Sequence, residues 1–413
     1  MKAGDPKAAA IRLPTPMRSL SQYAFFLLIL AIPVAAIPVA PAVSASSAAA
    51  SEELTPLLLS VPDAPMPFNG SDGLTHLVYE LAMTNFSSGE MFPERVEVLG
   101  DGKVLQTLEA TAIAGRLQPA GQRESAASLA KSTSARLFLH IVLEPGTAIP
   151  AQLMHRVTIR ASAAPPGHQE FTETGAPTPV DRKAVVVIGP PLQGSGYVSA
   201  DSCCDAPRHT RAALPIDGRI WIAQRMAVDW EQVNGQNSLY SGPQEKLESY
   251  TIFGKPVLAV ADAQVVQVTD GLPEQTPGKY PANLPLDQAD GNSVILDLGR
   301  GRYCMYAHMQ PGSIRVRKGD HVARGQIVGL VGNTGNSIVP HLHFQVMDRP
   351  SSLAANGLPY EIDAFQITGL ASGTAAFDEA ESKGTPLAMM RVSPPGEVKN
   401  ALPLDQLMIT FGK

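Results

Sequence analysis

The sequence is poor in cysteine, in charged residues and in aromatic residues. Its 413 residues include three cysteines, 17% charged residues and 6% aromatic residues. Three cysteines cannot form the disulfide framework of a small secreted scaffold. The 32 basic residues are outnumbered by 38 acidic ones, which gives a net charge of −6. The chain therefore lacks the excess of basic residues that would indicate a nucleic-acid partner, and we expect no such partner.

Glycine and proline are abundant by contrast, with 35 and 36 residues. This composition predicts many turns between short strands. Hydrophobic residues make up 44% of the chain, which is enough for packed cores. From the length we expect two or three domains.

Residues 1–50 have the features of a secretory signal peptide followed by a spacer of small residues. Four basic residues and one acidic residue lie within 1–18, residues 23–37 are uncharged and nearly all apolar, and small residues follow. This order is typical of a cleaved signal. The alternative is an uncleaved membrane anchor, but prolines interrupt the segment, and its densest part is shorter than the roughly 20 residues that span a membrane. We expect an exported protein, in the periplasm, the extracellular space or the cell wall, that contacts a membrane only through an uncleaved signal.

Beyond residue 50 the patterns predict an all-β chain. Short segments of alternating apolar and polar residues, separated by glycine and proline turns, predict a β-sandwich-like domain first. A denser series of short strands follows a glycine- and proline-rich stretch. The predicted organisation is a signal and spacer (1–50), an N-terminal all-β domain (51–189), a linker (190–200), a second β domain (201–366) and a C-terminal extension (367–413).

The strongest chemical signal is a His-x-His motif in the second β domain. His341 and His343 lie in the segment Pro-His-Leu-His-Phe, and a strand projects residues at this spacing to the same face. Both can reach one metal ion, or one can bind the ion while the other moves a proton. Single histidines in strand-like segments without metal-ligand spacing are expected to be structural: His76, His140 and His155.

Together with upstream segments, this motif resembles the lysostaphin-type zinc metallopeptidases, the duplicated-hybrid-motif endopeptidases that cleave peptides in bacterial cell walls. The resemblance covers roughly residues 219–348, and it implies small antiparallel sheets around an open groove. In that family zinc is held by the His and Asp of a His-x-x-x-Asp motif and by the second His of His-x-His. Those positions are here Arg225, Asp229 and His343. Two further family histidines, which assist the attacking water and the transition state, correspond to His308 and His341. The matching segments are 254–262, 291–297, 306–309, 316–329, 332–336 and 341–344.

Arg225 is the departure from the family pattern. A guanidinium has no lone pair to give and stays protonated, so it cannot replace a histidine ligand. In one interpretation, Arg225 pairs with Asp229 and takes the place of the ion. In another, zinc is bound weakly by Asp229 and His343 alone, because catalytic zinc normally has three protein ligands.

A third interpretation takes the missing ligand from further upstream. Asp217-Gly218 lies between two short apolar segments and is a strong hairpin signal. A two-residue turn places Arg225 opposite Thr210, whereas a three-residue turn with a bulge places it opposite His209. In the second register His209 replaces the missing ligand, and the alternative is a structural histidine.

The three cysteines are Cys203, Cys204 and Cys304. In an exported protein, Cys304 is a candidate to form a disulfide with Cys203 or Cys204, because a disulfide between adjacent residues would be strained. A cysteine ligand to zinc is the less favoured alternative.

The sequence thus predicts an exported zinc metalloendopeptidase that cleaves peptide bonds in peptidoglycan and binds one Zn²⁺ if the site is intact. His341 is the candidate general base, and His308 the group that stabilises the developing oxyanion or holds the substrate carbonyl. The expected partners are peptidoglycan peptides, with other cell-wall enzymes as an additional class. The alternative is a catalytically inactive protein of the same fold that binds peptidoglycan or a partner enzyme. Arg225 favours that alternative, while retention of the other four family residues favours the enzyme.

Overall fold

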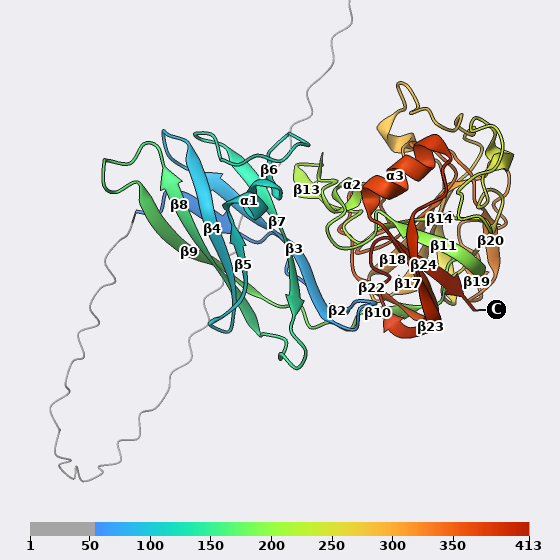
Figure 1. The fold of residues 1–413 in the computed structure, drawn as a ribbon, viewed down its shortest axis with the longest axis horizontal. Helices are drawn as coiled ribbons and strands as arrows, with labels where there is room; N and C mark the ends of the chain where they lie inside the picture. Colours follow the sequence, from blue (N-terminus) through green and yellow to red (C-terminus); the bar gives the residue numbers. More distant parts are fainter. Residues whose placement is uncertain (1–53, 413) are drawn as a thin grey trace, which may run out of the picture. The chain divides into compact units, whose positions relative to one another are not determined.

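The computed structural model describes residues 54–412, which belong to one compact unit. The predicted signal and spacer lie outside the described residues. Nearly all regular structure in 54–412 is β-strand (Figure 1), which confirms the all-β prediction. Over the same residues no helix is both long and apolar enough to cross a membrane.

Two antiparallel sheets form the N-terminal part of the described chain and share one hydrophobic core. Alternation of side chains along β3 and β4 sends residues such as Leu77, Leu81 and Val96 into that core. The first sheet contains β1 (Leu57–Ser60), β3 (Thr75–Asn85), β7 (Ser134–Leu143) and β6 (Leu117–Pro119), with β2 (Phe68–Asn69) paired to β3. The second contains β5 (Lys103–Glu109), β4 (Met91–Gly100), β8 (Gln152–Ala161) and β9 (Glu170–Pro179), and a short helix, α1 (Ala110–Ala114), follows β5.

An 11-stranded sheet carries the rest of the described chain. Its neighbouring strands are antiparallel except for β10 and β22, which are parallel. In spatial order the strands are β10 (Val186–Ile188), β22 (Tyr360–Ala371), β24 (Leu407–Phe411), β11 (Gly194–Ala200), β14 (Val228–Gln232), β21 (Leu342–Met347), β18 (Arg302–Met309), β17 (Asn292–Gly299), β16 (Ala263–Thr269) and β19 (His321–Val322), with β23 (Met389–Ala401) paired to β22.

Short elements connect these strands. The turn Asp217-Gly218 has φ of 50° and 74°, as a two-residue hairpin turn requires, and it joins β12 (Leu214–Ile216) to β13 (Arg219–Trp221). A second two-stranded antiparallel sheet consists of β15 (Pro256–Leu258) and β20 (Ile327–Leu330). The remaining helices are α2 (Pro207–Thr210), α3 (Thr374–Lys383) and two 3-10 turns, Leu247–Ser249 and Leu286–Gln288.

Two of the ranges predicted as connections supply strands of the large sheet. The range 190–200, for which we predicted a linker, contains β11, which pairs with β14 and β24. The range 367–413, predicted as a C-terminal extension, supplies β23, β24 and α3 and part of β22. Strand β24 lies between β22 and β11, so the extension completes the sheet that holds β14.

A buried ion pair connects β3 to the turn before β14. Arg225 Nε and Nη2 donate to the two carboxylate oxygens of Glu80 at 2.8 and 2.7 Å, and Arg225 Nη1 donates to the Gly357 carbonyl oxygen at 3.1 Å. Both side chains are buried, with 7% and 3% exposed. This bidentate hydrogen bonding is the strongest kind of interaction that an arginine makes with a carboxylate.

Glu80→Ala should lower the free energy of unfolding of the full chain by about 3–5 kcal/mol, because the buried guanidinium loses both of its short carboxylate contacts and keeps only Asp63, at 4.0 Å, as a counter-charge. Denaturant unfolding measures this change. Glu109→Ala is the matched control, since it removes an ion pair with Arg95 whose side chains are 62% and 51% exposed. The control should leave the unfolding midpoint almost unchanged. An equally small effect of Glu80→Ala would contradict the role of the buried pair.

Candidate metal centre

Asp229 and His343 face each other from two neighbouring strands. They are directly opposite in the register of β14 and β21, so their side chains lie on the same face of the sheet. His343 Nδ1 lies 2.8 Å from Asp229 Oδ1, and His343 Nε2 lies 2.9 Å from Gln345 Oε1. With Nε2–H donated to the side-chain amide oxygen of Gln345, Nδ1 is the ring nitrogen that faces Asp229 and is available to a cation.

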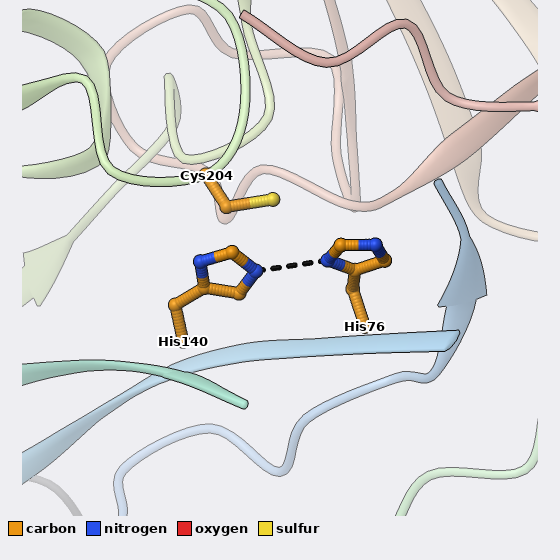
Figure 2. A group of neighbouring side chains, drawn as sticks. All are labelled: His76, His140 and Cys204. Carbon is orange, nitrogen blue, oxygen red and sulfur yellow. Dashed lines mark hydrogen bonds between the residues drawn. The ribbon is translucent and has the colours of Figure 1, made fainter. Parts of the chain in front are cut away.

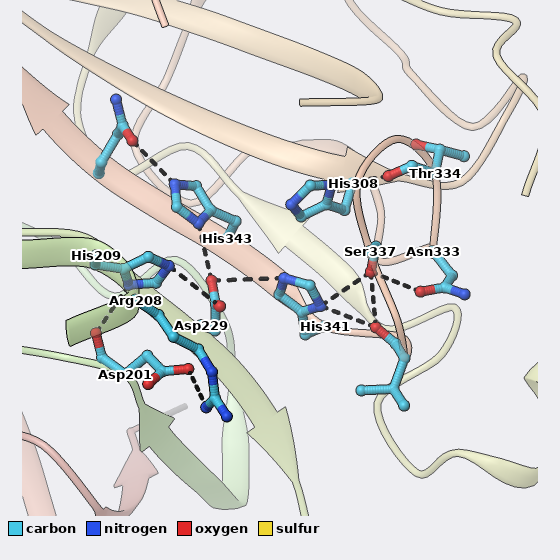
Figure 3. Close-up of polar contacts among 12 residues, drawn as sticks. Asp201, Arg208, His209, Asp229, His308, Asn333, Thr334, Ser337, His341 and His343 are labelled. Carbon is cyan, nitrogen blue, oxygen red and sulfur yellow. Dashed lines mark hydrogen bonds and ion pairs between the residues drawn. The ribbon is translucent and has the colours of Figure 1, made fainter. Parts of the chain in front are cut away.

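His209 reaches the same carboxylate from α2. Its Nε2 lies 3.3 Å from Asp229 Oδ2, and its Nδ1–H donates to the Asp201 carbonyl oxygen at 2.8 Å. Nε2 is therefore the nitrogen that faces Asp229, and it can bind a proton or a metal ion there. Ligand atoms of His209, Asp229 and His343 lie within 4.8 Å of one another (Figure 3). The structure thus brings together the three residues predicted for a site with a replaced ligand.

The element that carries His209 differs from the predicted one. The β12–β13 hairpin has the two-residue register, with Leu214 opposite Trp221 and Ile216 opposite Arg219. Its pairing ends at Leu214, so His209 is not opposite Arg225. Pro207, which is at the N-terminal end of α2, favours helical rather than strand geometry there because its φ is fixed. A helical turn, not a neighbouring strand, therefore carries His209 to Asp229.

His341 lies beside the same carboxylate. Its Nε2 is 3.5 Å from Asp229 Oδ1, and its Nδ1–H donates to the Val339 carbonyl oxygen at 2.8 Å. Ser337 Oγ lies 3.2 Å from the same Nδ1. The backbone of the turn before β21 therefore fixes the ring orientation, and Nε2 is left as the atom that faces the site.

His308 enters the site through a bend in β18. Ala307 is opposite His343, so a regular strand would point His308 to the other face of the sheet. His308 has φ of 60°, a left-handed conformation that is uncommon for residues other than glycine. Its ring centroid is consequently 4.7 Å from that of His341, and its Nδ1–H donates to the Thr334 carbonyl oxygen at 2.7 Å.

These contacts test whether the residues fit a zinc ion. Each imidazole has one nitrogen engaged by an acceptor, and three of them direct the other nitrogen at one carboxylate. Lone pairs on nitrogen and oxygen at these distances repel each other unless a proton or a cation lies between them. Two imidazole nitrogens and one carboxylate oxygen, with a fourth position open, are a donor set of catalytic zinc. The residues present therefore fit the ion that the family resemblance implies.

The charges of the cluster stabilise each other. Burial alone would raise the pKa of Asp229, but the neighbouring His209 and His341 outweigh it and hold this pKa well below its usual range. Burial alone would lower the pKa of His209, but Asp229 raises it to about 9. Burial, together with His341 and His343, lowers the pKa of His308 well below its usual range. His308 is therefore neutral, and Asp229 is ionised.

Arg225 does not occupy the metal position. We predicted, as one interpretation, that it pairs with Asp229 in place of the ion, and this is wrong because the guanidinium is bound to Glu80 and Gly357. A buried guanidinium needs a carboxylate and further acceptors. Glu80 of β3 supplies the carboxylate, and the Gly357 carbonyl, between β21 and β22, is a further acceptor.

The cysteine prediction is also wrong. Cys203 and Cys204 form a disulfide with each other, and Cys304 is free and buried. Cys304 belongs to the core of the large sheet, with its Sγ 3.8 Å from the Tyr306 hydroxyl. The bend at His308 also means that Cys304 faces the core while His308 faces the site.

A pocket of about 410 Å³ opens beside the candidate ligands. Helix α3 contributes Phe377 and Glu381 to its wall. Arg208 of α2 donates to Asp201 at 2.9 Å and to Asp378 of α3 at 2.8 Å, which connects the two helices. The position of His209 therefore depends on the C-terminal segment. The sequence interpretation missed this dependence, since the amphipathic signal of α3 is weak and its partners lie far away along the chain.

Two acidic residues of this wall were also missed. Glu231 of β14 and Glu381 of α3 are adjacent, and burial raises the pKa of Glu231 well above its usual value and that of Glu381 to about 7. Two neighbouring carboxyl groups avoid being charged together. The pair therefore holds a proton in the range where free glutamates have lost theirs.

Comparisons with known proteins agree with the family resemblance. Residues 249–355 match the sequence profile of peptidase family M23. The match includes His308, His341 and His343, while His209 and Asp229 lie before it. The peptidoglycan DD-endopeptidase ShyA of Vibrio cholerae serotype O1 is 42% identical over 59 residues, which cover 14% of this chain and 13% of that protein. The glycyl-glycine endopeptidase ALE-1 of Staphylococcus capitis is 32% identical over 94 residues, covering 23% and 22%. The matched segment is thus less than a quarter of either relative.

Solved structures of peptidases match over a larger part of the chain. The catalytic domain of lysostaphin from Staphylococcus simulans matches 40% of this chain and 88% of its own, with 24% identity and a TM-score of 0.22. A zinc-containing peptidase from Vibrio cholerae matches 71% of this chain and 83% of its own, with 17% identity and a TM-score of 0.21.

The proton held by the Glu231–Glu381 pair predicts a pH dependence of stability. The pKa of Glu381, about 7 in the folded chain, lies above its ordinary value of 4.5, so its contribution is fully present below pH 4.5 and is lost as the pH rises through 7. Glu381→Gln should therefore flatten the fall in unfolding free energy between these pH values. Denaturant unfolding across a pH series measures it. Glu379→Gln, on the same helix but 58% exposed, should leave the profile unchanged, and coinciding profiles for wild type and Glu381→Gln would contradict the prediction.

Proposed function

Taking residues 249–355 as a peptidase family M23 domain, we propose that the chain is a zinc metalloendopeptidase that hydrolyses peptide bonds in peptidoglycan. His209, Asp229 and His343 would hold the ion. The observation that carries the proposal is the convergence of two imidazole nitrogens on one carboxylate, at 3.3 and 2.8 Å. The hydrogen bonds on the far nitrogens of both rings support it, because such partners orient histidine ligands in metal sites.

The reaction needs a proton acceptor next to the metal site. When bound, zinc lowers the pKa of a water molecule and polarises the scissile carbonyl. His341 is suited to accept the proton of that water, because its Nδ1–H is fixed on Val339 and its Nε2 is free. Asp229 Oδ1, 3.5 Å from this Nε2, would stabilise the imidazolium that forms. The same ring can then give the proton to the leaving amine.

His308 receives a different role from the one that the sequence predicts. An oxyanion stabiliser must donate an N–H, but the Nδ1–H of His308 is already donated to Thr334. The ring is neutral because its pKa lies well below the usual range, through burial and the neighbouring His341 and His343. Its Nε2 is therefore an acceptor. We assign to it the orientation of the attacking water or of a substrate N–H group.

Peptidoglycan as the substrate is supported by the relatives, whose names describe a peptidoglycan DD-endopeptidase and a glycyl-glycine endopeptidase. Arg123 lines the pocket beside the site and offers a cation to the carboxylates of a wall peptide. A substrate in the cell wall requires an exported enzyme, in line with the signal-like residues 1–50. Other cell-wall enzymes are the additional partners that we propose.

The alternative function, an inactive regulator of the same fold, depended on Arg225. Because Arg225 is engaged by Glu80 and His209 faces Asp229, the lack of a histidine at position 225 does not count against metal binding. The peptidase is therefore the function that we propose.

Elemental analysis of the full chain, purified without reductant, should find one zinc ion, and His209→Ala should lose it. Removal of one of three protein ligands leaves a weak site. His321→Ala is the matched control, because His321 is an exposed histidine of β19, and it should keep the ion. Zinc retained by His209→Ala would remove this residue from the site. A wild-type chain that binds no zinc from excess metal would exclude the metallopeptidase.

His341→Ala should lower kcat for release of peptides from purified peptidoglycan by roughly 10²–10⁴-fold, the usual contribution of a general base, while zinc content stays unchanged. The loss of activity with the metal retained separates proton transfer from metal binding. Unchanged kcat would show that another group accepts the proton, and the His321→Ala chain again provides the reference.

A further inference from the structure

A second group of metal-ligating side chains lies away from the pocket. His76 of β3 and His140 of β7 come from paired strands, where His140 is opposite Val78, so the two histidines are diagonal neighbours on one face. Cys204 reaches them from the segment that follows β11. Ligand atoms of the three residues lie within 4.8 Å of one another, and Figure 2 shows the Cys204 sulfur above the two rings.

Each ring has an inner nitrogen, which faces the other ring, and an outer nitrogen, which faces a carboxylate. His76 Nε2 lies 3.0 Å from Asp72 Oδ1, and His140 Nδ1 lies 3.0 Å from Asp205 Oδ2. A carboxylate accepts from N–H, so both outer nitrogens carry the hydrogen. The inner nitrogens, His76 Nδ1 and His140 Nε2, then face each other with lone pairs at 2.8 Å.

Two facing lone pairs at this distance require a positive charge between them. Carboxylates behind histidine rings are the arrangement that orients imidazole ligands in metal sites. Asp205 also has a positive charge beside it, because Arg116 forms an ion pair with its other carboxylate oxygen. His76 is buried, so the two rings are fixed by their surroundings before any ion binds.

We propose that reduction of the Cys203–Cys204 disulfide creates a second zinc site, formed by His76, His140 and the Cys204 thiolate. A disulfide sulfur is a poor ligand, whereas a thiolate binds zinc strongly. A dithiol reductant supplies two electrons and two protons: the S–S bond breaks, two thiols form, and the reductant becomes a disulfide. The Cys204 thiol then releases its proton to solvent as it binds Zn²⁺.

The geometry fits such an ion. Ligand atoms around tetrahedral zinc lie about 2.0–2.3 Å from the metal and hence roughly 3.3–3.6 Å from one another. The nitrogens at 2.8 Å must move apart by roughly half an ångström, and the sulfur already lies within 4.8 Å of both. Two imidazoles and one thiolate are a zinc-preferring donor set. The other occupant of the space is a proton shared between the two rings, which needs no thiol.

The test counts zinc in the full chain before and after treatment with a dithiol, which is removed before analysis. We expect one more zinc per chain after reduction. Cys203→Ser frees Cys204 permanently and should carry the additional ion without reductant. Cys204→Ser and His140→Ala should gain none, while Cys304→Ser, which changes the buried free cysteine, should gain it like the wild type. With Co²⁺ in place of Zn²⁺, the reduced chain should show a thiolate-to-cobalt absorption band that Cys204→Ser lacks.

The His209→Ala chain separates this site from the proposed catalytic one, since it should still gain one ion on reduction. Equal zinc content before and after reduction, or a gain that survives Cys204→Ser, would overturn the proposal. A Cys203→Ser chain with no additional zinc and no cobalt band would leave the shared proton as the occupant.

Discussion

One mostly buried carboxylate, that of Asp229, is the constraint on which the site depends. An ionised carboxylate removed from water is costly unless positive charge or N–H donors surround it. The order of β14, β21 and β18 in the sheet places histidines on the same face as this carboxylate. Without a metal ion, His209 keeps a proton beside Asp229, as its raised pKa shows. A cation bound there would displace this proton, so metal binding and proton uptake compete for the same space.

In the proposed site, the third ligand comes from a different part of the chain. The pattern that the sequence resembles has a histidine four residues before the aspartate, whereas our proposal takes His209 of α2 as the ligand. The vacated position holds Arg225, whose charge is balanced by Glu80. Helix α3 helps to hold His209 in place, because Arg208 of α2, the helix that carries His209, donates to Asp378 of α3. The N-terminal sheets and the C-terminal helix are therefore both part of what forms the site.

Local patterns were sufficient to predict part of this arrangement. The Asp-Gly hairpin and the all-β character follow from turn chemistry and side-chain period, and both are present. Of the two histidines expected on one strand, His343 is in β21, while His341 lies in the turn just before it. Contacts between distant segments could not be predicted in this way. They include the partner of Arg225 and the pair Glu231–Glu381. His209 was predicted to lie near Asp229, but on a strand that extended the hairpin. That extension ignored the helix that begins at Pro207 and carries His209. At the bend, the His308 N–H donates to the Asp290 carbonyl and its own carbonyl accepts from Gly332, contacts between segments that no local pattern records.

The ion pair between Glu80 and Arg225 determines how the molecule can be divided. Phe68 and Val78 of the N-terminal sheets belong to the same hydrophobic core as Trp230, the residue next to Asp229. A fragment that begins after residue 189 would therefore contain the whole candidate centre and yet lose both the counter-charge of Arg225 and part of that core. Excision or domain exchange at this boundary would transfer the ligands without the scaffold that positions them. For this chain the smallest transferable catalytic module includes β2 and β3.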